Sequence, residues 1–425
     1  MSTALRPSSP DRVRSKSRWE SLPRPPQLGP FREGAFTSER RDETSAAVLG
    51  MALGVAFTTC FLTGLLSHLW QEPRAWFWFP SRPAGLYRVT QGLHVLTGLM
   101  SIPLLVAKLW VVYPKLFEWP PIRSVLNLLE RLALLPLIGG SLLLLFTGLG
   151  NINIYRPWPF GFRGGHYWAA WLTIGGLIVH IGATWTISRR VLFRRGDDGA
   201  ETGSGPEHPP SDGDPGAAEP EPLPTGMNRR TFFATVFGSA GAIGVFTIGM
   251  SWKPLERLAL LAPRRPSFGP QGIPINRTAA EAGVTRATGE DPGWRLTIDG
   301  PGARRPRRFS LAELRAMPQR EATLPITCVE GWSANAHWKG VPVRDLLALV
   351  GAHDGAAATV MSFQKGNRLG SSDLNRDHAH DPDTLLALEL NGQPLHIEHG
   401  FPLRLIAPNR PGVLQTKWID RLMVR

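Results

Sequence analysis

The sequence contains few cysteines, and five long stretches of it contain no charged residue. Its 425 residues include only Cys60 and Cys328, too few for the disulfide framework that holds small secreted domains together. A hydrocarbon layer about 30 Å thick requires about 20 apolar residues of helix, and the charge-free stretches have this length. An ordinary soluble enzyme is thereby excluded. The predicted membrane spans are residues 46–70, 89–107, 132–154, 164–188 and 231–252.

Composition divides the chain into five parts. The segment before the first span is rich in proline, serine and arginine and has no periodicity, and residues 196–226 hold eight acids but no lysine or arginine; such segments do not form a packed core. The predicted parts are a disordered cytoplasmic tail (1–45), a four-helix membrane domain (46–190), a disordered linker (191–228), a fifth transmembrane helix (229–252) and a carboxy-terminal domain (268–425).

The excess of basic residues gives a formal charge of +13, which at first suggests nucleic acid. Many of the arginines flank the apolar stretches, however, where membrane topology explains them. More lysine and arginine follow the second and fourth spans than the first and third, which predicts a cytoplasmic amino terminus in a bacterial cell membrane. Five crossings then place the carboxy-terminal domain outside the cytoplasm, and no nucleic-acid partner is expected.

The fifth span is preceded by paired arginines. The sequence NRRTFF at 228–233 resembles the twin-arginine signal, which exports proteins already folded in the cytoplasm. A folded export cargo is typical of a domain that receives its cofactor inside the cell, so the twin-arginine export machinery is a predicted partner. The alternative interpretation is that Arg229 and Arg230 are ordinary cytoplasmic-side arginines.

The carboxy-terminal domain has the pattern of a mixed α+β fold. Residues 294–298 alternate like a strand and lead into a turn at Asp299-Gly300. Ser310 with Glu313 predicts a capped short helix. A further helix is predicted at 343–350 and a further strand at 403–408.

Four histidines lie within or near the edges of the predicted spans: His68, His94, His166 and His180. Ionisable residues inside a membrane are costly and mark functional sites. His166 and His180 are 14 residues apart, so both face the same side of one helix, about 21 Å apart along its axis. This spacing resembles the di-haem helices of the cytochrome b561-like electron carriers, which implies one or two b haems held by histidine pairs. The expected pairs are His68 with His166 and, despite a depth mismatch of about 15 Å, His94 with His180; hydrogen-bonded or interfacial histidines are the alternative.

The motif TCVEGWS at 327–333 is similar to the signature of the sulfite oxidase family of molybdenum-cofactor enzymes, in particular the branch with periplasmic methionine-sulfoxide reductase. The resemblance implies a molybdopterin-binding domain of sulfite oxidase type in which Cys328 is a thiolate ligand of molybdenum, rather than a buried core cysteine. Further matching segments are WKGVPV (338–343), IPINRT (273–278), DTLLA (383–387), NGQPL (391–395), HGFPLRL (399–405) and KWI (417–419).

The resemblance suggests roles for other residues of this domain. Glu330 is a candidate catalytic contact, with a solvated surface carboxylate as the alternative. Candidate contacts to the pterin or the active site are Asn276, His337 and His399, and candidate phosphate partners are Arg404 and Lys417. His378 and His380 are expected in a surface loop.

The sequence also departs from the family. No arginine-rich segment of the kind that binds an oxyanion surrounds Cys328, and after Pro408 the chain reads NRPGV in place of the family's aromatic-glycine pattern. This departure from the family disfavours sulfite, so a small S-oxide is the expected substrate.

Together these patterns predict a membrane-bound molybdenum-cofactor oxidoreductase. Haem b in the lipid would exchange electrons with the quinone pool or another membrane donor, and the outer molybdenum centre would transfer an oxygen atom from a small substrate. Three alternatives stay open: oxidation of a sulfite-like substrate with electrons flowing into the membrane, helices that form a bare anchor without haem, and an outer binding domain that holds no metal.

Overall fold

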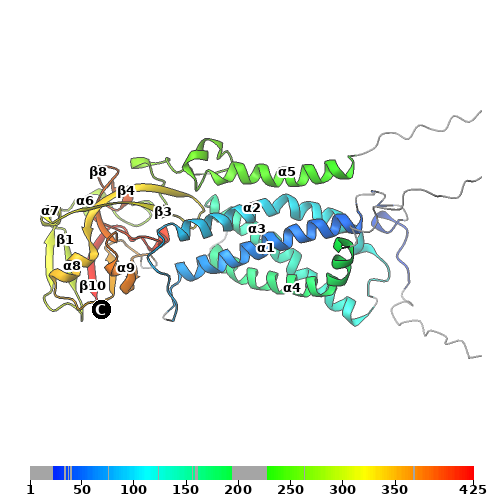
Figure 1. Ribbon diagram of the computed structural model, residues 1–425, viewed down its shortest axis with the longest axis horizontal. Coiled ribbons are helices and arrows are strands. Elements are labelled where there is room, and N and C mark those ends of the chain that lie inside the picture. Colours follow the sequence, from blue (N-terminus) through cyan, green and yellow to red (C-terminus); the bar gives the residue numbers. More distant parts are fainter. Residues whose placement is uncertain are drawn as a thin grey trace, which may run out of the picture.

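The structure is a computed structural model that describes residues 23–425 apart from 33–34, 37, 39–40, 75, 123, 156, 158–160, 194–226, 263 and 367–368. Most of the predicted amino-terminal tail and linker therefore falls outside the described residues. The rest forms a helical bundle with a smaller sheet domain at one end (Figure 1).

Five helices are long and apolar enough to cross a membrane. Each contains most of one predicted span, and polar side chains cap the amino ends of three of them before the apolar run begins. The side chain of Asp42, for example, accepts from the backbone N–H of Ser45 and so begins the first helix before its apolar run. The helices are α1 (Glu43–Gln71), α2 (Leu86–Val112), α3 (Val125–Ile152), α4 (Phe162–Phe193) and α5 (Arg229–Ile248).

The bundle is built from helix pairs. α1 packs along α2, α3 packs along α4, and α5 packs against α2. Small residues permit the close approach: a Cβ at Gly176 of α4 would lie 3.0 Å from the carbonyl oxygen of Ala133 on α3. α5 ends four residues before its predicted limit, at Ile248, because the backbone of Met250 turns to bond the carboxy-terminal domain.

The carboxy-terminal domain contains two sheets, which confirms the mixed α/β prediction. Their strand orders are β2-β1-β10-β5-β6 and β3-β4-β7-β8, with β9 paired to β7. β1 and β10 are parallel and the other described pairs are antiparallel. The strands are β1 (Arg295–Asp299), β2 (Arg307–Ser310), β3 (Arg320–Thr327), β4 (Ser333–Pro342), β5 (Ala358–Ser362), β6 (Ser371–Leu374), β7 (Leu385–Leu390), β8 (Gln393–Pro394), β9 (Arg404–Ile406) and β10 (Ile419–Val424).

Short helices cover these sheets. Ser310 and Glu313 form the predicted capping box at the start of α7. The predicted helix at 343–350 is α8, and its apolar side joins β1, β5 and β10 in a core that contains Leu346, Val360 and Leu422. The helices are α6 (Arg286–Gly289), α7 (Leu311–Ala316), α8 (Val343–Leu349) and α9 (Arg376–His380).

The sheet domain lies at the end of the bundle where α1, α3 and α5 finish, while the chain enters α1 at the opposite end (Figure 1). The start of α1 and the sheet domain therefore lie at opposite ends of the bundle, which is the arrangement expected for an odd number of helices. The loop between α1 and α2 joins the parts: Arg82 forms ion pairs with Asp381 and Asp383, and the side chain of Asn409 accepts from the N–H of Tyr87 at 2.9 Å.

Candidate active site and helix cavity

Cys328 lies in the loop that connects β3 to β4. The N–H of Cys328 bonds the carbonyl of Trp332 at 2.9 Å, and Thr327 bonds Ser333 through their hydroxyl groups at 2.8 Å. The turn is closed by Gly331 at φ +96°, a conformation that favours glycine. The hairpin therefore holds the thiol at a fixed place, and only 2% of Cys328 is exposed.

Burial raises the pKa of the Cys328 thiol well above its ordinary value, and the neighbouring charge of Glu330 raises it further. The protein alone therefore favours the neutral thiol. A bound metal cation reverses this preference, since it supplies the positive charge that stabilises a thiolate.

Glu330 is buried beside Cys328. The alternative interpretation, a solvated carboxylate on the surface, is therefore wrong. Its Oε2 accepts from the indole N–H of Trp332 at 3.0 Å and is ion-paired with Arg264. Burial raises the pKa of Glu330, and Arg264 opposes this shift. Arg264 belongs to the segment between α5 and the sheets. Although it lies close to the end of the fifth span in sequence, its side chain forms an ion pair inside the protein.

Two predicted cations lie buried near this site without a carboxylate within 4 Å among the described residues. Arg404 is 2% exposed, donates to the carbonyl of His399 at 3.2 Å, and its Nε has no hydrogen-bond partner. Lys417 donates to the carbonyls of Arg277 and Glu398 at 2.6 and 2.8 Å. Burial lowers the pKa of Arg404 to about 9, and burial with the charge of Arg404 lowers that of Lys417.

The other predicted contacts of this domain are placed differently. His399 is buried and its Nε2 donates to the carbonyl of Pro270 at 2.7 Å, so it joins the Arg404 cluster. Asn276 accepts from the N–H of Arg277 within the adjoining loop. His337 instead lies on the exposed face of β4, where its Nε2 is 3.2 Å from Glu321, because alternate residues of a strand face opposite sides.

The expectation of a surface loop around His378 is wrong. His378 is buried in α9, its Nδ1 lies 2.8 Å from the side-chain oxygen of Asn375, and its Nε2 has no hydrogen-bond partner. Burial and the charge of Arg410 lower its pKa to about 3, so the ring is neutral.

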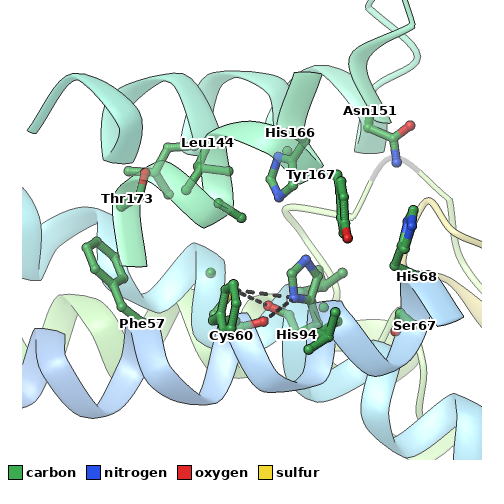
Figure 2. Close-up of a pocket in the computed structure, with 18 of the residues that line it drawn as sticks. Phe57, Cys60, Ser67, His68, His94, Leu144, Asn151, His166, Tyr167 and Thr173 are labelled. Atoms are coloured by element: carbon green, nitrogen blue, oxygen red, sulfur yellow. Dashed lines mark hydrogen bonds between the residues drawn. The ribbon is translucent and has the colours of Figure 1, made fainter. Parts of the chain in front are cut away.

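A cavity lies between α1, α2, α3 and α4. Figure 2 shows His94 and His166 directed into it from opposite sides. Most of the lining is apolar, with Leu144, Phe57 and Thr173 towards the end that is remote from the sheet domain. At the other end the lining includes Val329, which is the neighbour of Cys328 in the hairpin loop.

His94 and His166 form a facing pair, with ring centroids 6.1 Å apart. His94 Nδ1 lies 2.8 Å from the carbonyl of Cys60, so this nitrogen carries the proton. The hydroxyl of Thr147 donates to a carbonyl of its own helix and therefore accepts from His166 Nδ1, at 2.8 Å. Both rings thus keep the Nε2 lone pair for a ligand, as a second hydrogen-bonding shell does for metal-bound histidines.

The expected histidine pairs differ from this arrangement. His68 lines the same cavity, but its ring stacks on Tyr167 at a centroid distance of 3.9 Å instead of facing His166 (Figure 2). His180 is not among the residues that line the cavity, and its Nδ1 has no hydrogen-bond partner. His94 and His180 therefore do not face each other. The mismatch in depth predicted for this pair arises because the partner of His94 is His166.

Comparison with known protein families finds a match that covers most of the sheet domain. Residues 283–425 match the family described as "Oxidoreductase molybdopterin binding domain". These residues therefore form an oxidoreductase domain of the molybdopterin-binding type.

Three curated relatives are each similar to part of the chain. The chain is 37% identical over 116 residues to "Putative protein-methionine-sulfoxide reductase subunit YedZ1" of Azospira oryzae, covering 27% of this chain and 43% of that protein. It is 31% identical over 183 residues to nitrate reductase [NADH] 2 of Phaseolus vulgaris, covering 36% and 20%, and 28% identical over 152 residues to sulfite oxidase of Arabidopsis thaliana, covering 28% and 39%. The chain thus spans less than half the length of each.

The buried residues of the sheet domain fit a molybdopterin. Its terminal phosphate requires cations and N–H donors, and Arg404 and Lys417 are buried cations with no carboxylate within 4 Å among the described residues. Arg404 Nε is moreover a buried donor without an acceptor, which is costly unless a ligand satisfies it. Cys328 would supply the thiolate to the metal.

Arg404→Met tests this assignment with effects of opposite sign. Removing a buried unpaired charge is expected to raise the free energy of unfolding of cofactor-free protein by about 1–4 kcal/mol. The same change is expected to reduce the molybdopterin that copurifies, because the phosphate loses a partner. Denaturant unfolding and extraction of the pterin measure the two effects.

The matched control is Arg421→Met, since Arg421 is half-exposed on β10 and ion-paired with Asp299. It is expected to leave the pterin content unchanged. A cofactor-free Arg404→Met protein that is less stable than the parent, with full pterin content, would contradict the role of Arg404.

Proposed function

We propose that the protein is a membrane-bound oxidoreductase that reduces a small S-oxide, such as methionine sulfoxide, at a molybdenum centre supplied with electrons through a haem in the helix cavity. The observation that carries the proposal is the position of Val329. It lines the cavity of His94 and His166, and it is covalently bonded to Cys328. Two candidate cofactor sites therefore adjoin each other across one residue.

The bound molybdenum would supply the two-electron oxygen-atom chemistry. With a quinol as the membrane donor the reaction balances without another reactant: quinol and S-oxide give quinone, sulfide and water. The two protons that the quinol releases equal the two that the departing oxygen needs to form water. The protein must therefore hold a proton donor close to the metal ligand.

The residues of the sheet domain divide this work. Cys328 would anchor the metal, and Arg404 and Lys417 would hold the pterin phosphate. Glu330, fixed by Trp332 and Arg264, is the carboxyl group beside the ligand and would deliver a proton from Oε1, because Oε2 already accepts from both of these residues. Its rigid support favours this role, because a proton donor must stay within hydrogen-bond reach of the reacting oxygen.

The residues of the bundle fit one haem. Electron-transferring haems are held by two axial side chains, and a metal–imidazole bond is about 2 Å long. Facing rings whose centroids are 6.1 Å apart leave room for one such metal atom between them. Gly64 leaves room for the ring of His94, since a Cβ there would lie 2.8 Å from it.

The arrangement of the bundle supports an outer location of the sheet domain in a bacterial cell membrane, with lipid around the helices. The paired arginines would guide this domain through the twin-arginine machinery before they fold against the bundle. In the folded chain Arg229 is ion-paired with Asp42, at 2.9 Å.

Cofactor analysis followed by rapid mixing tests the proposed function. The purified protein is expected to contain about one molybdenum and one b-type haem per chain. Haem reduced by a quinol should be reoxidised when methionine sulfoxide is added, and sulfite should not replace the quinol as the reductant. Protein that folds without molybdenum, or haem that sulfite reduces, would contradict the proposal.

A further inference from the structure

The carbonyl of Val329 joins the two parts of the molecule. It accepts from the side-chain amide of Gln91 on α2 at 3.2 Å and from that of Asn151 on α3 at 3.1 Å. A carbonyl oxygen has two lone pairs, so both are used by the bundle. No residue of its own domain is needed to satisfy this oxygen.

Gln91 lies one helical turn from His94, and Asn151 lies one helical turn from Thr147, the hydrogen-bond partner of His166. Gln91 precedes His94 by three residues, which places both on one face of α2 about 4.5 Å apart along its axis. Asn151 follows Thr147 by four residues on one face of α3, and Thr147 bonds His166. Two short routes therefore lead from the facing rings to the same peptide group.

The rest of the hairpin loop is also hydrogen-bonded to the segment that follows α5. The hydroxyl of Ser251 donates to the carbonyl of Gly331 at 2.7 Å, and the N–H of Ser333 bonds the carbonyl of Met250 at 2.9 Å. The loop that carries Cys328 is thus fixed to α2, to α3 and to the segment after α5. General docking of the domain is provided elsewhere, by Arg82 and Asn409.

We propose that the Val329 peptide, held by Gln91 and Asn151, is the contact through which electrons cross from the helix cavity to the molybdenum site. This inference rests on the proposed function. In each turnover two electrons leave the quinol, which becomes quinone with release of two protons. They cross one at a time and reach the S-oxide, which takes up two protons and gives sulfide and water.

The test separates transfer between the sites from chemistry at the molybdenum. The variants are Gln91→Leu, Asn151→Leu and the double variant. The rate of haem reoxidation by methionine sulfoxide is measured after reduction by a quinol, and turnover is measured separately with a reduced viologen dye that donates to molybdenum directly. Haem and molybdenum contents show that each variant has folded and loaded.

The double variant is expected to reoxidise its haem about tenfold more slowly, as the loss of two hydrogen bonds loosens the contact, while dye-driven turnover stays unchanged. The matched control is Asn153→Leu, because Asn153 lies two residues from Asn151 and its side-chain amide donates to the carbonyl of Leu149 within its own helix. The control should keep both rates.

A measurement without electron transfer adds to the test. In protein made without molybdopterin, amide hydrogens of residues 328–333 are expected to exchange faster in the double variant than in the parent or the control. If the double variant does not load, the two single variants decide by the same rates.

Unchanged haem reoxidation in variants whose loop exchanges faster would overturn the inference and leave the proposed function standing. An equal loss of both rates would also overturn it, since the amides would then only shape the molybdenum site. A parent protein without haem, or whose haem methionine sulfoxide does not oxidise, would contradict the proposed function itself and this inference with it.

Discussion

Replacing Cys328 with serine is expected to lower molybdenum content and S-oxide turnover by more than about a hundredfold, since loss of a mere outer-shell partner of a metal site costs about 10- to 100-fold. Serine keeps the size and burial of the side chain, so the hairpin with its Trp332 and Ser333 contacts should persist. A serine hydroxyl ionises far less readily than a thiol and is a harder ligand, and soft sulfur donors suit this class of site. Metal analysis and turnover with the viologen dye measure the effect.

Cys60→Ser is the matched control for this change. Cys60 lies on α1, with its Sγ 3.4 Å from His94 Nδ1, far from the pterin cations along the chain and in the other part of the molecule. It should keep molybdenum and dye-driven turnover. Retention of full turnover by the Cys328→Ser protein, with its haem absorption intact, would show that the metal has another anchor.

Much of the fold could be predicted because its signals are local. Charge-free runs longer than a membrane is thick give five helices, whatever surrounds them. The Ser310 capping box and the alternation at 294–298 depend on neighbours within a few residues, and both elements occur as expected. Helix ends differ, where caps such as Asp42 extend a helix beyond its apolar run, and the surface loop expected around His378 is instead the helix α9.

The histidine pairing could not be predicted in the same way. Periodicity shows that His166 and His180 share one face of α4, but it does not show which helix lies opposite or how far each helix is shifted along its axis. α2 begins three residues before the predicted span, and His94 lies opposite His166 instead of His180. Tyr167 stacks on the ring of His68 and so separates it from the pair.

Residues that connect the two parts were missed for a related reason. Gln91, Asn151 and Arg264 lie far in sequence from the groups they contact, and only the folded chain brings them to the Cys328 loop. One signal was present: the chain departs from the family pattern after Pro408. The side chain of Asn409 in that segment accepts from the N–H of Tyr87 at 2.9 Å and donates to the carbonyl of Pro80 at 2.8 Å. The residues that depart from the family pattern therefore contact the bundle.

His94→Ala and His166→Ala are each expected to remove the b-type haem absorption and to lower quinol-driven turnover by more than about a hundredfold, because an axial ligand is lost. Dye-driven turnover and molybdenum content should remain close to those of the parent. Reduced-minus-oxidised spectra and both assays measure these effects in one preparation.

His180→Ala provides the control and separates two arrangements of the bundle. His180 lies on the same helix as His166 but does not line the cavity, so its loss should leave the haem absorption complete. Loss of half the haem in His180→Ala would instead require a second haem held outside the cavity. Full haem in His94→Ala would remove the facing pair as the ligand set and, with it, the short route from the cavity through Val329 to Cys328.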